Sequence, residues 1–182
     1  MIVPIIFDID SLEDNGFNCY LKGRSYDLQE NWVEYSAENA VKYYKKGYYE
    51  FKDKMCQYSI AISNYLGDFD YLFDDNDKKI LFPTFKEIEE LSTSENKIVS
   101  IYAKFILAAY YNYGLAGVEK DEDKAFEIIY ECALNGHIGA MYDLGAKDKF
   151  KSRIENSEQF LIMASDNGSI RAKEHISNYK KH

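Results

Sequence analysis

Carboxylates that could take part in chemistry gather in two segments of this 182-residue sequence. In the first, Asp8 and Asp10 follow the apolar run IVPIIF. Two nearby carboxylates can serve phosphoryl transfer, one as a nucleophile and one as a proton donor or acceptor, with the help of a metal ion. No pattern of alternating strands that could hold them follows in the sequence. Phosphatase activity is therefore a remote alternative, and we predict no catalytic residue and no cofactor.

The pair Asp8 and Asp10 resembles the nucleophile motif of haloacid-dehalogenase-type phosphatases. The resemblance implies that one carboxylate attacks phosphorus, that the second handles the proton of the leaving group beside a magnesium ion, and that both follow a strand of a doubly wound sheet. Where that motif continues with Gly-Thr, this sequence has Ser11-Leu12. No lysine and no second acidic pair follow a later apolar strand. The resemblance therefore stops at the two aspartates.

The second carboxylate segment is GDFDYLFDDNDKK, from residue 67 to residue 79. Dense aspartates suggest calcium, but an EF-hand loop needs a central glycine and a closing glutamate, and this run has neither, so we predict no metal site. A solvated acidic loop is the simplest alternative. Phe69, Tyr71 and Phe73 alternate with the acids, and aromatic anchors beside negative charges suit a partner that brings Lys or Arg. We predict partner contacts at Asp68, Asp70, Tyr71, Asp74, Asp75 and Asp77.

The net charge narrows the class of partner. The sequence has 22 Lys and Arg residues against 31 Asp and Glu residues, which gives a formal charge of −9. Residues 149–182 carry +3, so the rest of the chain carries −12. Such a surface repels nucleic-acid phosphates and anionic lipid headgroups, which argues against nucleic-acid and membrane binding. It favours a basic protein partner.

Cysteine number and hydropathy indicate the compartment. Cys19, Cys56 and Cys132 are odd in number and far apart, so a full disulfide framework is excluded and reducing conditions are expected. No apolar stretch reaches the roughly 18 residues that span a bilayer. The opening MIVPIIFDIDSLED turns acidic before a signal-peptide pattern is complete. We expect a cytoplasmic location.

Internal self-similarity predicts the fold. Residues 124–145 align with residues 156–176, and Asn135-Gly136 falls on Asn167-Gly168. Ahead of each Asn-Gly pair, apolar and small residues recur at helical spacing and form one face. The glycine that follows can adopt the left-handed conformation that ends a helix. Two helices that end in the same way indicate a repeated unit.

A helix with its apolar face at residues 103–110, a glycine-containing loop and a helix after Lys120-Asp121 complete this unit. The pattern consists of Ala103, Leu107-Ala108, Tyr111, Gly114, Gly117-Val118, Lys120-Asp121, Lys124-Ala125, Ala133 and Gly136-His137. These residues are similar to the Sel-one-like repeat, a relative of the tetratricopeptide repeat. The resemblance covers about residues 100–172 and implies antiparallel helix hairpins that bind proteins.

Residues farther upstream predict another hairpin. Ser36 is a candidate N-cap for a helix over 36–51, and a second helix over 54–67 ends at Gly67. A short helix is expected at 85–91.

The first 30 residues do not fit the repeat. IVPIIF has the composition of a strand, but Pro4 restricts it to an edge or irregular segment. Asp27 and Glu30 match a capping box, which predicts a helix that carries Trp32 and Tyr35.

The predicted fold is all-α: a short right-handed α-solenoid of antiparallel helix hairpins with an irregular or short-strand N-terminal extension. The extension takes residues 1–30 and the solenoid residues 31–182. Within the solenoid we expect a degenerate hairpin at about 36–67, an acidic loop at 68–77, the best repeats at about 100–172 and a C-terminal capping helix. No single repeat can bury its apolar face, so the repeats must stack.

The sequence has more tyrosines than the core of the repeats needs. The additional ones are candidates to line the concave side of the solenoid, because a tyrosine offers a large contact area and a polar tip. The four candidates for partner binding are Tyr43, Tyr48, Tyr111 and Tyr113. His137 follows a helix end and has no cysteine or acid at a catalytic spacing, so we predict that it packs in the interior.

Together these features predict a non-enzymatic protein-binding module. Its most concrete form is an acidic bacterial immunity or antitoxin protein that binds and occludes a cationic toxin domain. The alternative is a general adaptor or scaffold built from the same repeats.

Overall fold

The structure is a computed structural model that describes residues 2–179. Every regular element in this range is helical, which confirms the predicted all-α class. The helices are α1 (Gly16–Leu28), α2 (Ala37–Phe51), α3 (Lys54–Leu66), α4 (Phe85–Ser92), α5 (Lys97–Tyr113), α6 (Glu122–Leu134), α7 (Ile138–Ala146), α8 (Asp148–Lys151), α9 (Ser157–Asp166) and α10 (Ile170–Tyr179). Three short 3-10 turns also occur in this range: η1 (Ile9–Ser11) before α1, η2 (Asp77–Lys79) between α3 and α4, and η3 (Leu115–Gly117) between α5 and α6.

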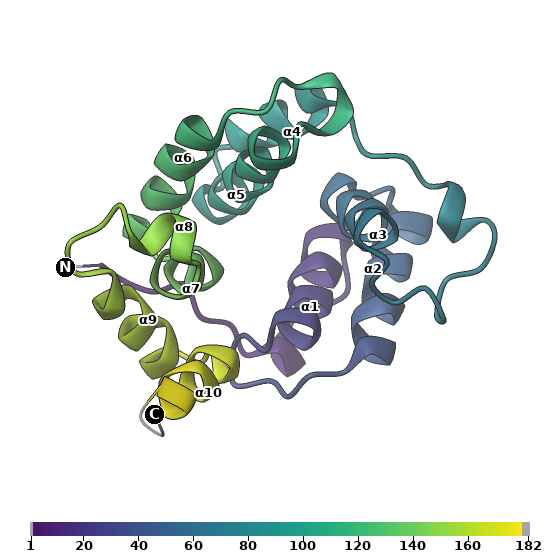
Figure 1. Ribbon diagram of the computed structural model, residues 1–182. Coiled ribbons are helices and arrows are strands. Elements are labelled where there is room, and N and C mark those ends of the chain that lie inside the picture. Colours follow the sequence, from purple (N-terminus) through teal and green to yellow (C-terminus); the bar gives the residue numbers. More distant parts are fainter. Residues whose placement is uncertain (1, 180–182) are drawn as a thin grey trace.

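Helices that follow one another in the sequence pack as neighbours. α1 packs on α2, α4 on α5, α5 on α6 and α9 on α10, while α7 packs mainly on α9. In Figure 1 the helices follow a curved path that brings α10 back toward α1. The Trp32 N–H donates to the Gly168 carbonyl at 2.8 Å, and the Ile170 N–H donates to the Gln29 carbonyl at 3.0 Å. These two hydrogen bonds fix the start of α10 against the turn that follows α1.

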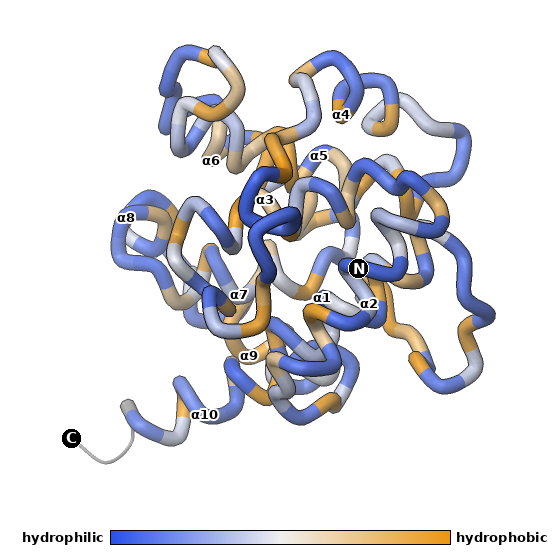
Figure 2. The backbone as a smooth tube through the Cα atoms, turned by 90° about the vertical axis from the view of Figure 1, so that its right-hand side faces the viewer, coloured by the Kyte–Doolittle hydropathy of each residue, from blue (hydrophilic) through white to orange (hydrophobic). Residues whose placement is uncertain are grey.

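The core has two parts. The first lies among α1 to α5 and includes the buried side chains of Tyr20, Tyr44 and Ile106. The second lies mainly among α6 to α9 and includes Met141 and Leu144. Figure 2 shows apolar residues spaced along the helices, with hydrophilic residues in most loops and along the projecting end of α10.

Helix ends that the sequence predicted from cap residues are confirmed. The Ser36 hydroxyl accepts a hydrogen bond from the Asn39 N–H (3.2 Å) at the start of α2. Gly67 ends α3 in the left-handed conformation. The predicted helix at 85–91 is α4, which begins with a capping box made by Thr84 and Glu87.

Both Asn-Gly pairs end helices as predicted, and each glycine also receives another part of the chain. Gly136 and Gly168 have φ angles of 93° and 99°. A Cβ on Gly136 would lie 2.1 Å from the carbonyl oxygen of Val3, and one on Gly168 would lie 3.0 Å from the indole of Trp32. Only glycine combines a left-handed backbone with so close an approach. The two turns therefore hold the N-terminal segment and the turn after α1.

The prediction for the first 30 residues needs correction. Residues 2–8 form neither helix nor strand, so the short-strand alternative is wrong and the irregular one is right. The Ile5 N–H donates to the Gly136 carbonyl at 2.8 Å, but no neighbouring strand extends this contact into a ladder. Helix α1, which begins at the N-cap Asn15 and packs against α2 and α3, was not predicted from the sequence.

The helix predicted to carry Trp32 and Tyr35 is absent. Asn31 and Trp32 have left-handed φ angles of 55° and 57°, which a right-handed helix cannot contain. Glu30 does not cap a helix, because its carboxylate pairs with Arg24. The chain makes a turn here.

We predict that Gly47→Ala destabilises the protein. In an exposed helix this change would stabilise by about 1 kcal/mol. Here a Cβ would lie 2.2 Å from Cys56 Sγ and 3.1 Å from Cys19 Cβ, so overpacking should cost about 1–3 kcal/mol. Urea unfolding measures the difference. The exposed Glu50→Ala on the same helix should stay within about 0.5 kcal/mol of the wild type. A Gly47→Ala protein as stable as the wild type would contradict the packing described here.

Candidate functional site

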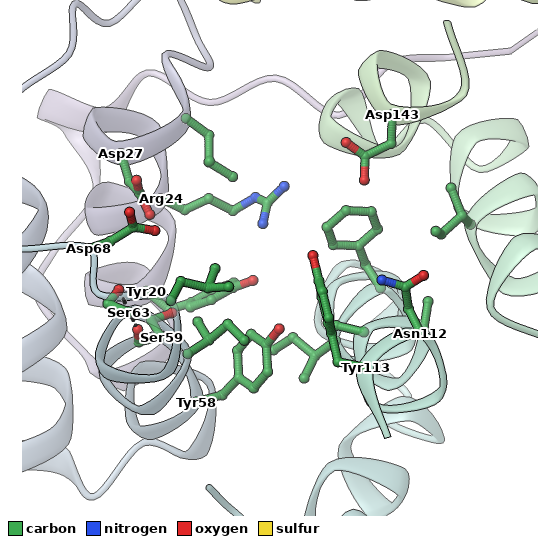
Figure 3. A pocket seen from close by; sticks show the side chains of 18 of the residues that line it. Tyr20, Arg24, Asp27, Tyr58, Ser59, Ser63, Asp68, Asn112, Tyr113 and Asp143 are labelled. Carbon is green, nitrogen blue, oxygen red and sulfur yellow. Dashed lines mark hydrogen bonds between the residues drawn. The ribbon is translucent and has the colours of Figure 1, made fainter. Parts of the chain in front are cut away.

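A pocket of about 220 Å³ lies among α1, α3, α5 and α7, and we call it the central pocket (Figure 3). Tyr20 and Ile106 form part of its buried wall. Leu66 and Tyr113 are 52% and 42% exposed, so they lie at its opening. The pocket therefore has a mostly apolar interior and an accessible mouth.

Arg24 of α1 reaches this pocket while it is held by a buried ion pair. Its Nε donates to Glu30 Oε2 and its Nη2 donates to Glu30 Oε1, both at 3.0 Å. Both side chains are buried. Two parallel hydrogen bonds to a carboxylate fix the plane of the guanidinium as well as its position.

Helices α5 and α7 surround this ion pair. The guanidinium of Arg24 lies 5.0 Å from the ring centre of Phe105 and 5.5 Å from that of Tyr102, both on α5. On α7, a Cβ on Gly139 would lie 2.2 Å from Arg24 Nη2 and 2.6 Å from Glu30 Oε1. The glycine leaves the space that the ion pair fills, so Arg24 and Glu30 join α1 to α5 and α7.

Asp27 and Asp68 lie together on one wall of the pocket (Figure 3). The Tyr44 hydroxyl donates to Asp27 Oδ2 at 3.1 Å. Burial raises the pKa of Asp27 to about 6 and nearby Asp68 adds to the rise, while the Tyr44 hydrogen bond and the charges of Arg24 and Arg171 oppose it. Neither aspartate forms a salt bridge with a basic side chain within residues 2–179.

Three helix C-termini converge on the same region. The last turns of α1, α3 and α5 contribute Asp27, Leu66 and Tyr113 to the pocket. None of these last turns contains a basic residue. A helix C-terminus carries roughly half a negative charge, which a basic side chain normally offsets. The backbone therefore adds to the negative potential of the two aspartates.

The other charged residues of the pocket contact neighbouring side chains, although the buried Nε of Arg171 makes no hydrogen bond within residues 2–179. Asp143 accepts a hydrogen bond from Lys147 at 2.8 Å. The guanidinium of Arg171 lies 3.7 Å from the ring centre of Tyr142. Negative charge without an ion-pair partner is thus concentrated at Asp27 and Asp68.

Exposed aromatic and apolar side chains lie next to these aspartates. Tyr35 and Tyr71 are 54% and 75% exposed. Burial, followed by the charges of Tyr71, Asp27 and Asp68, raises the pKa of Tyr35, which places each of these three groups within electrostatic reach of Tyr35. We call the set Asp27, Tyr35, Leu66, Asp68 and Tyr71 the aromatic–acidic rim.

Several residues of the acidic loop at 68–77 are buried in the protein, which its sequence does not indicate. Asp77 is fully buried and accepts hydrogen bonds from Lys45 Nζ (2.6 Å) and the Tyr49 hydroxyl (2.8 Å). Its carboxylate therefore does not reach the surface. Phe69 and Phe73 are core residues, so their prediction as exposed anchors is wrong.

The remaining residues of that loop are accessible. Asp70, Tyr71 and Asp75 are exposed. Asp74 is also exposed, although it accepts hydrogen bonds from the N–H groups of Asn76 and Asp77. Their partner-binding role stays a prediction.

Of the four tyrosines predicted for the concave side, Tyr113 lines the central pocket. The other three pack elsewhere. Tyr43 stacks on Tyr26, Tyr48 packs edge-on against Tyr49, and Tyr111 packs against Phe85. Their part in partner binding likewise stays a prediction.

Arg24 and Asp27 were not predicted as site residues, because α1 was not predicted. The available signal was Asn15, whose side chain accepts a hydrogen bond from the Asn18 N–H at 2.9 Å and caps the helix. Nothing local marked Glu30 as the partner of Arg24.

The remaining candidates for chemistry have local roles. Asp8 is exposed and caps η1 by accepting a hydrogen bond from the Asp10 N–H. The sheet that a phosphatase motif requires is missing from residues 2–179, and no group of three metal-ligating side chains occurs there. Burial raises the pKa of Cys19 to about 11 and that of Cys132 to about 12, so these thiols are poor nucleophiles at neutral pH.

His137 packs in the interior, as predicted. It is fully buried, and its Nδ1 accepts a hydrogen bond from the Ala140 N–H (3.0 Å) to cap α7. Its ring centre lies 4.3 Å from that of Phe105 and 4.4 Å from that of Tyr102. Burial, and secondarily the charge of Arg24, lowers the pKa of His137 well below its ordinary value.

Comparison with known proteins adds no relative. No protein-family model matches the sequence, and searches of curated proteins and of solved structures gave no significant match. None of the helices in residues 2–179 is long and apolar enough to cross a membrane.

We predict that Arg24→Met lowers the free energy of unfolding by about 3–5 kcal/mol, because it leaves the Glu30 carboxylate buried without a partner. The double variant Arg24→Met/Glu30→Gln should recover part of this loss. Urea unfolding of both variants gives the comparison. Lys120→Met removes an exposed ion pair with Glu122 and should cost less than about 1 kcal/mol. A loss that small for Arg24→Met would show that the buried pair is dispensable.

We predict that His137 makes the protein less stable in acid. Its folded pKa lies below the unfolded value of about 6.5, so below that pH the unfolded chain binds a proton that the folded chain does not. From about pH 7 to pH 5 the wild type should lose about 1–2 kcal/mol relative to His137→Asn, which keeps a capping acceptor and does not titrate. Urea unfolding at several pH values gives the pH dependence of the unfolding free energy for the wild type and for His137→Asn. The same pH dependence in both proteins below pH 6.5 would rule out a neutral buried histidine.

Proposed function

We propose that this protein binds a basic protein through the aromatic–acidic rim. The observation that carries the proposal is the pair Asp27 and Asp68, which lies at converging helix C-termini without an ion-pair partner. Exposed Tyr35 and Tyr71 beside this pair supply contact area that a partner can desolvate. The formal charge of −9 would steer a cationic partner toward the protein.

The most concrete form of the proposal is an immunity or antitoxin protein that covers the active surface of a cationic toxin domain. The high negative charge supports this form, because a cationic toxin needs an acidic surface to occlude it. We place the protein in the cytoplasm, where its buried free cysteines would stay reduced.

The scaffold we propose is a short right-handed α-solenoid of the Sel-one-like kind, with the central pocket on its concave side. The two matching Asn-Gly turns and the packing of successive helices as neighbours support this arrangement. Solenoids commonly bind partners on such a surface.

Co-purification with the product of the neighbouring gene tests the proposal. We expect a stoichiometric complex, rescue of growth on co-expression, and an affinity that falls at least about tenfold between about 0.1 M and 1 M salt. Asp68→Lys and Tyr71→Ala should each weaken the complex at least about tenfold. Glu95→Gln, an exposed acid in the α4–α5 loop, is the matched control and should have little effect.

Two results separate the alternatives. Failure to form a complex, together with no rescue of growth, would refute the immunity role. A complex whose affinity does not depend on salt would favour the general adaptor, because contacts in a groove rather than charge would then dominate.

A further inference from the structure

Some acidic side chains near the central pocket form an ion pair with a basic side chain, and others do not. Glu30 is paired with Arg24, and Asp143 with Lys147. Asp77 is paired with Lys45. Within residues 2–179, Asp27 and Asp68 have no such partner although they lie near each other. Two neighbouring carboxylates repel, and a cation placed between them would remove that repulsion.

None of the basic residues that line the pocket forms an ion pair with Asp27 or Asp68. Arg24 is held in two hydrogen bonds by Glu30, Lys147 is bound by Asp143, and Arg171 lies on the ring of Tyr142. Arg24 and Arg171 do lower the pKa of Asp27 from a distance, but burial still raises it to about 6. The compensation is therefore incomplete.

The size and walls of the site suit one long side chain. A volume of about 220 Å³ is smaller than the roughly 300–1,000 Å³ of pockets that hold drug-sized ligands. Leu66 at the opening offers apolar contact for a methylene stem, and the exposed rings of Tyr35 and Tyr71 offer faces for a cation.

Arginine fits these features better than lysine does. Its planar guanidinium carries five N–H donors, so it can bind two carboxylates at once and stack on an aromatic ring. The lysine ammonium is a compact and strongly hydrated charge that neither stacks nor bridges in this way.

We infer that an arginine side chain of the partner enters the mouth of the central pocket, with its guanidinium between Asp27 and Asp68 and against Tyr35 or Tyr71. This inference rests on the proposed binding of a basic protein and specifies the contact that the rim makes. It assigns Asp27 and Asp68 as the residues that select the partner's arginine.

The test uses the full-length protein and small probes in place of the partner. Nα-acetyl-arginine amide is titrated against ¹⁵N-labelled protein by NMR, with Nα-acetyl-citrulline amide as the uncharged probe of similar shape and Nα-acetyl-lysine amide as the other cation. We expect saturable shifts at residues 27, 35, 68 and 71, with a Kd of about 1–10 mM, a typical range for a weak fragment. The lysine probe should bind several-fold more weakly, and the citrulline probe should not bind.

Variants locate the contact. Asp68→Asn should weaken the binding of the arginine probe at least about fivefold. Asp68→Lys should abolish this binding by placing a cation in the site. Asp75→Asn, an exposed acid of the same loop, is the matched control and should leave the Kd unchanged. Because Asp68 is exposed, these changes should not unfold the protein, and an unchanged spectrum elsewhere verifies this.

Three results would each overturn the inference: equal binding of the citrulline or lysine probe, an unchanged Kd in Asp68→Asn, or shifts spread over all surface acids. The proposed function would survive them if a basic partner still formed a salt-sensitive complex, since that complex would then use another surface. If the probe binds as expected and no complex forms, the proposed function fails while the arginine site stands.

Discussion

The buried ion pair between Arg24 and Glu30 is the constraint on which much of this structure depends. A buried charge without a partner is costly, so the two side chains must stay together in the folded state. To reach Arg24, Glu30 must lie in a turn directly after α1, and the left-handed residues Gln29, Asn31 and Trp32 form that turn. The same turn makes the hydrogen bonds that fix the start of α10. The ion pair therefore positions α1 against α5 and α7, and the turn that carries Glu30 also links α1 to the start of α10.

The position of α1 also determines which charged groups line the central pocket. It brings the C-terminus of α1, with Asp27, next to the C-terminus of α3, where Asp68 follows the end of the helix. The helix dipoles and the two carboxylates reinforce one another, while Arg24 and Lys147 are paired with other acids and Arg171 packs on Tyr142. Tyr35 and Tyr71 are exposed, and Tyr35 lies within electrostatic reach of both aspartates. The fold thus contains one satisfied buried ion pair and a second group of charges that the proposed partner would pair.

Sequence patterns predicted those parts of the fold that depend on local chemistry. The cap at Ser36, the glycine end at Gly67 and the two Asn-Gly turns all rely on backbone preferences within a few residues. Helix α1 was missed for a physical reason. It buries Lys22, Gly23, Arg24 and Ser25 together with its apolar residues, so it has no single apolar face and lacks the periodicity that identifies a surface helix.

The site could be predicted only in part, because its members come from distant segments. Asp68 and Tyr71 were identified from their place in an acidic, aromatic loop, but Asp27 and Tyr35 became relevant only when the fold brought them beside that loop. Burial of Asp77 could not be foreseen either, since its partners Lys45 and Tyr49 lie on α2. The most direct measurement of the central claim is an NMR titration of the Asp27 side-chain carboxyl in the protein without a partner. We predict a pKa of about 6 for Asp27, with a lower value in Asp68→Asn. A pKa near the ordinary 3.8 would contradict it, because the carboxylate would then already be compensated and the rim would need no cation.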